Sequence, residues 1–190
     1  MESDIGETQH PIADTVLSGF GAGTVLIAAQ MLISAALGGP PSGPLRLISS
    51  IVLGRQALDP SYPFAGAVSV GLVIHLALSI VFALLFLFLV IIMGRITAAH
   101  QLIVLGFCYG ILLWLINFYL IGRTVFPQFL ETNQFWNGFI AHALFYGVPL
   151  GWCMTEGHML PPLKREISGS RRRSSFRTDR NPMEHASNRH

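Results

Sequence analysis

Charged residues are scarce in this chain, and their scarcity excludes an ordinary soluble fold. Only 12% of the 190 residues are Asp, Glu, Lys or Arg, whereas 52% are hydrophobic, and the mean hydropathy is +0.55. Four long stretches lack all four charged types, and they lie between Asp14 and Arg46, Asp59 and Arg95, Arg95 and Arg123, and Glu131 and Glu156. This composition is typical of a membrane protein.

Groupings of residues that carry out catalysis are also missing. The sequence has no Ser-His-Asp pattern, no paired carboxylates in or just above the apolar stretches, no HExxH and no phosphate-binding glycine loop. The only two cysteines, Cys108 and Cys153, fall within apolar stretches and are interpreted as reduced small hydrophobes. We therefore expect a protein that is not an enzyme.

Each charge-free stretch can hold a membrane span, because about 20 residues of helix cross roughly 30 Å of hydrocarbon. Lipid offers no hydrogen-bond partner to an open backbone, so the spans must be helical. We predict an all-α membrane protein with four transmembrane helices, near residues 15–37, 67–93, 101–121 and 134–155. The membrane domain would cover residues 15–156, after an acidic N-terminal segment (1–14) and before a basic tail (157–190).

Lys and Arg predict the orientation of the spans. With four spans both termini share a side, which would hold nine of the 12 Lys and Arg residues, against Arg46, Arg55 and Arg123 on the other. The positive-inside rule then places both termini in the cytoplasm. The N-terminal segment has no Lys or Arg, unlike a signal peptide, so the first helix is expected to remain as a span.

Two segments outside the spans have their own patterns. The first outer loop begins and ends in turn residues, and residues 44–58 between them predict a short amphipathic helix, with Ser49 and Ser50 mostly on its polar side. This helix would lie in the headgroup layer or re-enter among the spans. The tail is too polar to fold alone, so disorder is expected.

The tail contains three consecutive arginines, Arg171, Arg172 and Arg173. They could contact anionic lipid headgroups, or they could only anchor the topology. Nucleic-acid binding is not expected, because the tail arginines lack interleaved aromatic residues apart from Phe176.

A weak internal repeat relates the two halves of the membrane domain. The first match is between "GFGAG" at 19–23 and "GFCYG" at 106–110, and each of these is followed by an amide, Gln30 or Asn117. The second match is between "GLVIH" at 71–75 and "GFIAH" at 138–142. The matches keep their order, so we predict two similar helical hairpins with the same orientation.

Small residues spaced along these helices predict close helix packing. The candidate packing residues are Gly19, Gly23, Gly71, Gly106, Gly110, Gly138, Gly147 and Gly151. Since helical side chains lean toward the N-terminus, Gly71 and Gly138 are expected to leave room for the rings of His75 and His142.

The repeat also predicts that four polar side chains meet at one depth, in the outer half of the bundle. These are Gln30, His75, Asn117 and His142. The first interpretation is structural: each neutral histidine donates to an amide or carbonyl on a neighbouring helix of an accessory or structural membrane subunit. The second is a small carrier or channel subunit. The third is a haem or a metal ion held by His75 and His142. Against a metal site, only these two strong ligands are available, and Cys108 and Cys153 are expected toward the other face.

Two stretches of the sequence resemble small four-span bacterial membrane proteins of unknown function. They are "GFCYGILLWLINFYLIGRTVFPQF" and "GFIAHALFYGVPLGW". The resemblance spans about residues 15–155 and rests on Gly71, His75, Gly106, Gly110, Trp114, His142, Gly147 and Gly151. It implies a bacterial inner membrane and supplies no activity. The expected partners are the lipid bilayer and either further copies of the chain or a larger membrane complex.

Overall fold

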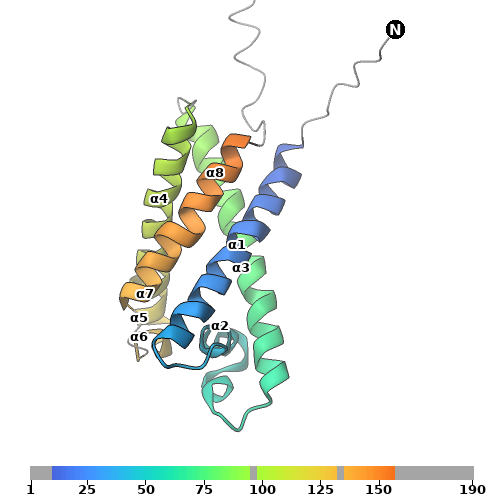
Figure 1. The fold of residues 1–190 in the computed structure, drawn as a ribbon, viewed down its shortest axis with the longest axis vertical. Helices are drawn as coiled ribbons and strands as arrows, with labels where there is room; N and C mark the ends of the chain where they lie inside the picture. Colours follow the sequence, from blue (N-terminus) through green and yellow to red (C-terminus); the bar gives the residue numbers. More distant parts are fainter. Residues whose placement is uncertain (1–9, 95–97, 132–134, 157–190) are drawn as a thin grey trace, which may run out of the picture. The chain divides into compact units, whose positions relative to one another are not determined.

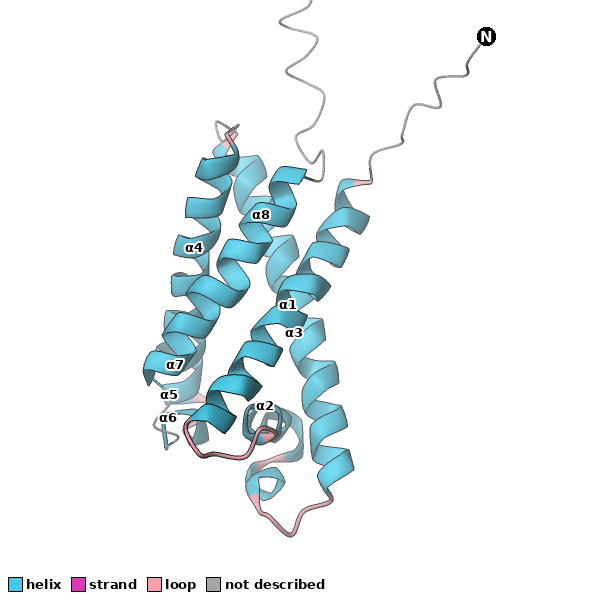
Figure 2. Ribbon diagram, viewed as in Figure 1, coloured by secondary structure: helices cyan, strands magenta, loops and turns pink. Residues whose placement is uncertain are grey.

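The fold is known from a computed structural model, which describes residues 10–94, 98–131 and 135–156. Within these ranges the chain forms helices and no strands (Figure 2), so the prediction of an all-helical protein is confirmed. The tail (157–190), with Arg171, Arg172 and Arg173, and most of the acidic N-terminal segment lie outside the described residues.

Three helical segments are long and apolar enough to cross a membrane: α1 (Pro11–Ala36), α3 (Phe64–Met93) and Ala99–Thr124. Each begins two to four residues before the corresponding predicted span. The helix α1 extends upstream because Pro11 suits the first turn, where a missing backbone N–H costs nothing. These helices support a membrane location.

The third of these segments is not regular throughout. It consists of α4 (Ala99–Leu115), the π-helix η2 (Ile116–Ile121) and the single turn α5 (Gly122–Thr124), and the short helix α6 (Gln128–Glu131) follows. A π turn is wider than an α turn, is rare, and frequently lies at a functional site. No residue pattern in the sequence predicted this one.

The chain is again helical from Phe135 to Glu156, nearly the range of the predicted fourth span. Three elements follow one another here: α7 (Phe135–Ile140), the π-helix η3 (Ala141–Gly147) and α8 (Val148–Glu156). Pro149 has no N–H for the carbonyl of Phe145, which favours a widened turn just before it.

The predicted loop helix forms as α2 (Gly43–Leu53), followed by a 3-10 turn, η1 (Arg55–Leu58). Gly54 separates them with a φ of 76°, a left-handed value that favours glycine. The expected polar side is wrong in part, because Ser49 and Ser50 are buried. Their hydroxyls donate to backbone carbonyls one turn earlier, which makes burial tolerable.

The helices pack in two groups (Figure 1): α1 lies against α3, and α4 lies against η3 and α8. Gly19 and Gly23 face α3, where a Cβ atom on either would lie within 2.6 Å of a side-chain atom of Ala83 or Ser79. Close backbone contact is therefore needed on this face of α1.

The second group packs even more closely, backbone against backbone. A Cβ atom on Gly106 would meet the carbonyl of Gly147, and one on Gly151 would lie 2.5 Å from the carbonyl oxygen of Leu102. On Gly110 it would meet the carbonyl of His142. Glycines from both helices thus form this contact.

Two buried tyrosines connect the second group to α3. The hydroxyl of Tyr109 in α4 donates to the carbonyl of Phe82 at 2.8 Å, and that of Tyr146 in η3 donates to the carbonyl of Ser79 at 2.6 Å. Both phenols are thereby satisfied inside the bundle, as buried polar groups require.

Replacing Gly19 by alanine should destabilise the fold by about 1–3 kcal/mol, because the added methyl group would overlap Ala83 and the backbone of α3. Thermal unfolding of detergent-purified protein measures the change. The matched control is Gly21→Ala in the same helix, where a Cβ atom meets nothing within 4 Å. Equal stability of the two variants would contradict the packing described for α1.

Candidate functional site

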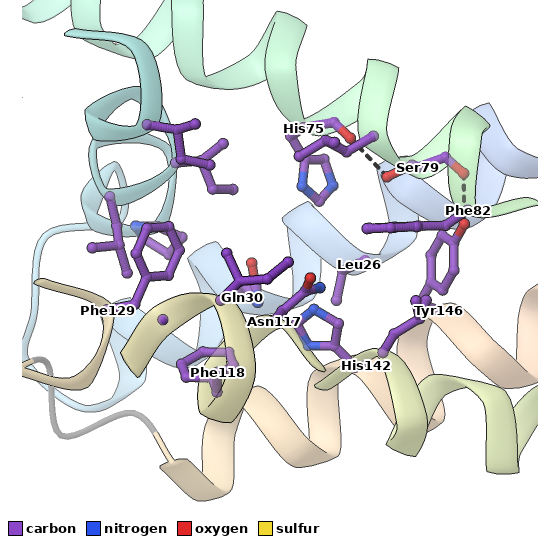
Figure 3. A pocket seen from close by; sticks show the side chains of 18 of the residues that line it. Leu26, Gln30, His75, Ser79, Phe82, Asn117, Phe118, Phe129, His142 and Tyr146 are labelled. Carbon is purple, nitrogen blue, oxygen red and sulfur yellow. Dashed lines mark hydrogen bonds between the residues drawn. The ribbon is translucent and has the colours of Figure 1, made fainter. Parts of the chain in front are cut away.

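The four polar side chains singled out in the sequence line one cavity. Gln30, His75, Asn117 and His142 all border a space of about 330 Å³, at the end of the bundle where α2 packs (Figure 3). The remaining lining is mostly apolar and includes Phe82, Phe118, Phe126, Phe129 and Tyr146. The structure therefore brings together residues that lie up to 112 positions apart in the chain.

His75 connects two helices. It lies on α3, is 6% exposed, and its Nε2 atom donates to the carbonyl of Gly23 in α1 at 2.8 Å. On the same helix the hydroxyl of Ser79 donates to the carbonyl of His75, as the dashed line in Figure 3 shows. One nitrogen of this ring is thus committed to holding α1 against α3.

His142 makes a different contact. Its Nδ1 atom donates to the carbonyl of Gly138, one turn earlier in the same helical segment, at 2.8 Å. The ring also meets Phe118 edge to face, with ring centres 6.2 Å apart. This hydrogen bond orients the ring without joining two helices, whereas the structural interpretation expected a partner on a neighbouring helix.

The glycine one turn before each histidine also packs against another element. A Cβ atom on Gly71 would meet the backbone carbonyl of Leu45, so Gly71 makes room for α2. A Cβ atom on Gly138 would lie 3.0 Å from Trp114 Nε1 and from the ring of Phe118. Both glycines are needed for packing against other elements.

The amides of Gln30 and Asn117 project toward the cavity (Figure 3) and make no hydrogen bond to another described residue. Each carries two donors and an acceptor. A polar group in an apolar lining is costly unless it finds a partner. These amides are therefore available to a molecule in the cavity.

Both π-helical segments border the same space. Asn117 is the second residue of η2, and His142 is the second residue of η3. π turns often mark functional sites, because they redirect a side chain and free backbone groups. This feature supports the site independently of its polar side chains.

Two contacts that sequence reasoning missed join α2 and η1 to α6. Gln128 in α6 is buried, and its side-chain amide donates to the hydroxyl of Ser50 in α2 at 3.1 Å. Arg55 in η1 forms a two-pronged ion pair with Glu131 in α6, at 2.9 and 2.6 Å. These partners lie 76 and 78 positions apart, so no local pattern reveals them.

The ion pair between Arg55 and Glu131 is exposed. The hydrogen bond from Arg55 holds the pKa of the Glu131 carboxyl below its usual value, and the same bond raises the pKa of Arg55. Among the described residues, no Asp, Glu, Lys or Arg lines the cavity.

Metal binding finds little support among the described residues, where no three His, Cys, Asp or Glu side chains group together. His75 and His142 alone could supply two ligands, and in each ring one nitrogen already donates to a carbonyl. The haem or metal interpretation remains a prediction.

Comparison with known proteins adds no assignment: no family model, curated protein or solved structure matches the chain. The resemblance to four-span bacterial proteins therefore remains a prediction.

Replacing His75 by leucine should lower the free energy of unfolding by about 0.6–1.7 kcal/mol, the range of interhelical hydrogen bonds in membranes. His142→Leu should cost less, because its hydrogen bond stays within one helical segment. Thermal unfolding of the two variants in the same detergent makes the comparison. A larger loss for His142→Leu would contradict these roles.

Acidification should weaken the contact between η1 and α6. Because the pKa of Glu131 is lower in the folded state, its ion pair adds stability above the ordinary value of 4.5. That stability should be lost as the pH falls through the lowered pKa. Between about pH 6 and pH 3 the parent should lose more thermal stability than Glu131→Gln, which lacks the titrating group. Parallel curves would show that the pair contributes nothing.

Proposed function

We propose that this chain is a non-catalytic four-span membrane protein that holds one small uncharged molecule in the cavity between its helices. The observation that carries the proposal is the pair of amides, Gln30 and Asn117, which have no partner among the described residues and face a mostly apolar space of about 330 Å³. Mostly apolar pockets with a few convergent polar groups are the usual form of small-molecule sites.

The fourth span in this proposal is the helical segment Phe135–Glu156. Two features support it: the segment carries no charge between its ends, and it packs along α4 through glycines on both sides. Backbone contact of this kind is what holds helices together in lipid, where the hydrophobic effect between them is weak.

The two-hairpin repeat is part of the proposal. In support, the glycine pair in the first helix of each half faces the other long helical segment of that half. Gly19 and Gly23 face α3, and Gly106 and Gly110 face the segment Phe135–Glu156. The amide eleven residues after the first glycine reaches the same cavity in both halves. A duplicated hairpin would place one amide and one histidine from each half at the same depth in the membrane.

The topology follows from the sequence. With both termini in the cytoplasm, by the positive-inside rule, the α2 end of the bundle and its cavity would lie in the outer half of the membrane. The resemblance to bacterial four-span proteins favours a bacterial inner membrane. As an accessory subunit, the chain would present the bound molecule to further copies or to a larger complex; as a carrier, it would release the molecule on the other side.

Filling the cavity should abolish binding. Leu113 is buried in its lining, so Leu113→Trp should displace the bound molecule, whereas Leu112→Trp, at a 49% exposed neighbouring position, should not. Each protein is extracted with its surrounding lipid in polymer-bounded discs, and native mass spectrometry measures what remains bound. This measurement would also reveal a haem by its mass.

The outcome supporting the proposal is a stoichiometric mass carried by the parent and Leu112→Trp and absent from Leu113→Trp. The proposal fails if the parent carries only bulk lipid, or if both tryptophan variants carry the same material.

A further inference from the structure

The hydrogen bonds of the two histidines fix which groups they can offer to a bound molecule. A backbone carbonyl can only accept, so His75 Nε2 and His142 Nδ1 must each carry the proton. In a neutral imidazole the other nitrogen is then an acceptor. The cavity is therefore lined by two imidazoles whose second nitrogens, His75 Nδ1 and His142 Nε2, accept hydrogen bonds.

Both rings are expected to be neutral in this surrounding. Among the described residues, no carboxylate lines the cavity to pair with an imidazolium, and an unpaired charge among apolar side chains is very costly. Neither second nitrogen has a hydrogen-bond partner among the described residues. A molecule that satisfies them must bring a donor of its own.

The amides complement these acceptors. The NH₂ groups of Gln30 and Asn117 can donate to an oxygen that at the same time donates to a histidine nitrogen. A hydroxyl group is the simplest uncharged group that does both. An ether or a ketone oxygen can only accept and would leave the histidine nitrogens unsatisfied.

The rest of the lining favours a flat ring over a long chain. Phe118 stands edge to face with both His142 and Phe129, with ring centres 6.2 and 6.3 Å apart, and Phe82 and Phe126 also border the space. Aromatic faces and edges attract further rings. A volume of about 330 Å³ lies at the small end of ligand pockets, which suits one or two rings.

We infer that the occupant of this cavity is an uncharged aryl alcohol, with one or two rings, whose hydroxyl donates to a histidine nitrogen and accepts from an amide. The inference rests on the proposed function and names its ligand class. It assigns His75 and His142 as acceptors and Gln30 and Asn117 as donors.

The test compares 2-naphthol with 2-methoxynaphthalene, in which a methyl group replaces the hydroxyl proton and removes the hydrogen-bond donor. Full-length protein in lipid nanodiscs is equilibrated with each probe, and empty nanodiscs of the same composition correct for partition into lipid. We expect 2-naphthol to bind at least about tenfold more tightly, because the ether leaves a buried acceptor unpaired.

A variant separates the hydroxyl contact from general apolar binding. His142→Leu should reduce the preference for 2-naphthol to within about twofold, since it removes one acceptor. His100→Leu, the same change at an exposed position in α4, should retain the full preference. If His142→Leu does not fold, the comparison of the two probes on the parent still decides the matter.

The possible failures are distinguishable. Equal binding of the two probes would overturn the ligand class and leave small-molecule binding itself supported. Binding of neither probe would overturn the inference, while the masses carried by Leu113→Trp and Leu112→Trp would decide the proposed function on their own. A preference that survives in His142→Leu and His75→Leu alike would show that the histidines do not read the hydroxyl.

Discussion

Backbone contact between helices at glycine is the constraint on which the rest of this structure depends. Lipid gives two apolar helices little reason to associate, so van der Waals contact must do most of the work. Gly106 and Gly147 let α4 and η3 meet backbone to backbone, and Gly110 extends the contact to the carbonyl of His142. Beyond that level the large side chains of Trp114 in α4 and Phe118 in η2 pack against Gly138, where a Cβ atom would lie 3.0 Å from both. The cavity borders this second region, because Phe118 and His142 line it.

Much of the architecture could be predicted because it is written in local composition. The charge-free stretches predicted the ends of the helices to within a few residues. A charged side chain in the hydrocarbon is so costly that it marks the end of a span. From the proposed repeat we predicted that Gln30, His75, Asn117 and His142 lie at one depth, and in the structure these residues border one space. The sequence could indicate depth in this way. It could not indicate which atoms would bond.

What the sequence did not reveal depends on contacts between distant segments or on small changes of helix geometry. Three contacts join segments that share no sequence pattern. They are the packing of α2 against Gly71, the hydrogen bond between Ser50 and Gln128, and the ion pair between Arg55 and Glu131. The π turn at η3 has a local signal in Pro149, whereas the turn at η2 has none. The contacts of the two glycines before the histidines were missed for the same reason: side-chain direction within a helix was known, but the neighbouring element that packs on each glycine was not.

The two histidines show how one residue type can stabilise a bundle and still offer a hydrogen-bond acceptor. Each ring donates one N–H to a backbone carbonyl, and His75 in doing so also ties α3 to α1. This hydrogen bond fixes the tautomer of a neutral ring, and with it the acceptor character of the remaining nitrogen, although no charged residue lines the described part of the cavity. A layer made only for stability would be expected to satisfy the amides as well, because unpaired polar groups inside a bundle are costly. Among the described residues, one nitrogen of each histidine has a hydrogen-bond partner and neither amide has one, and the groups that remain are complementary to a hydroxyl group.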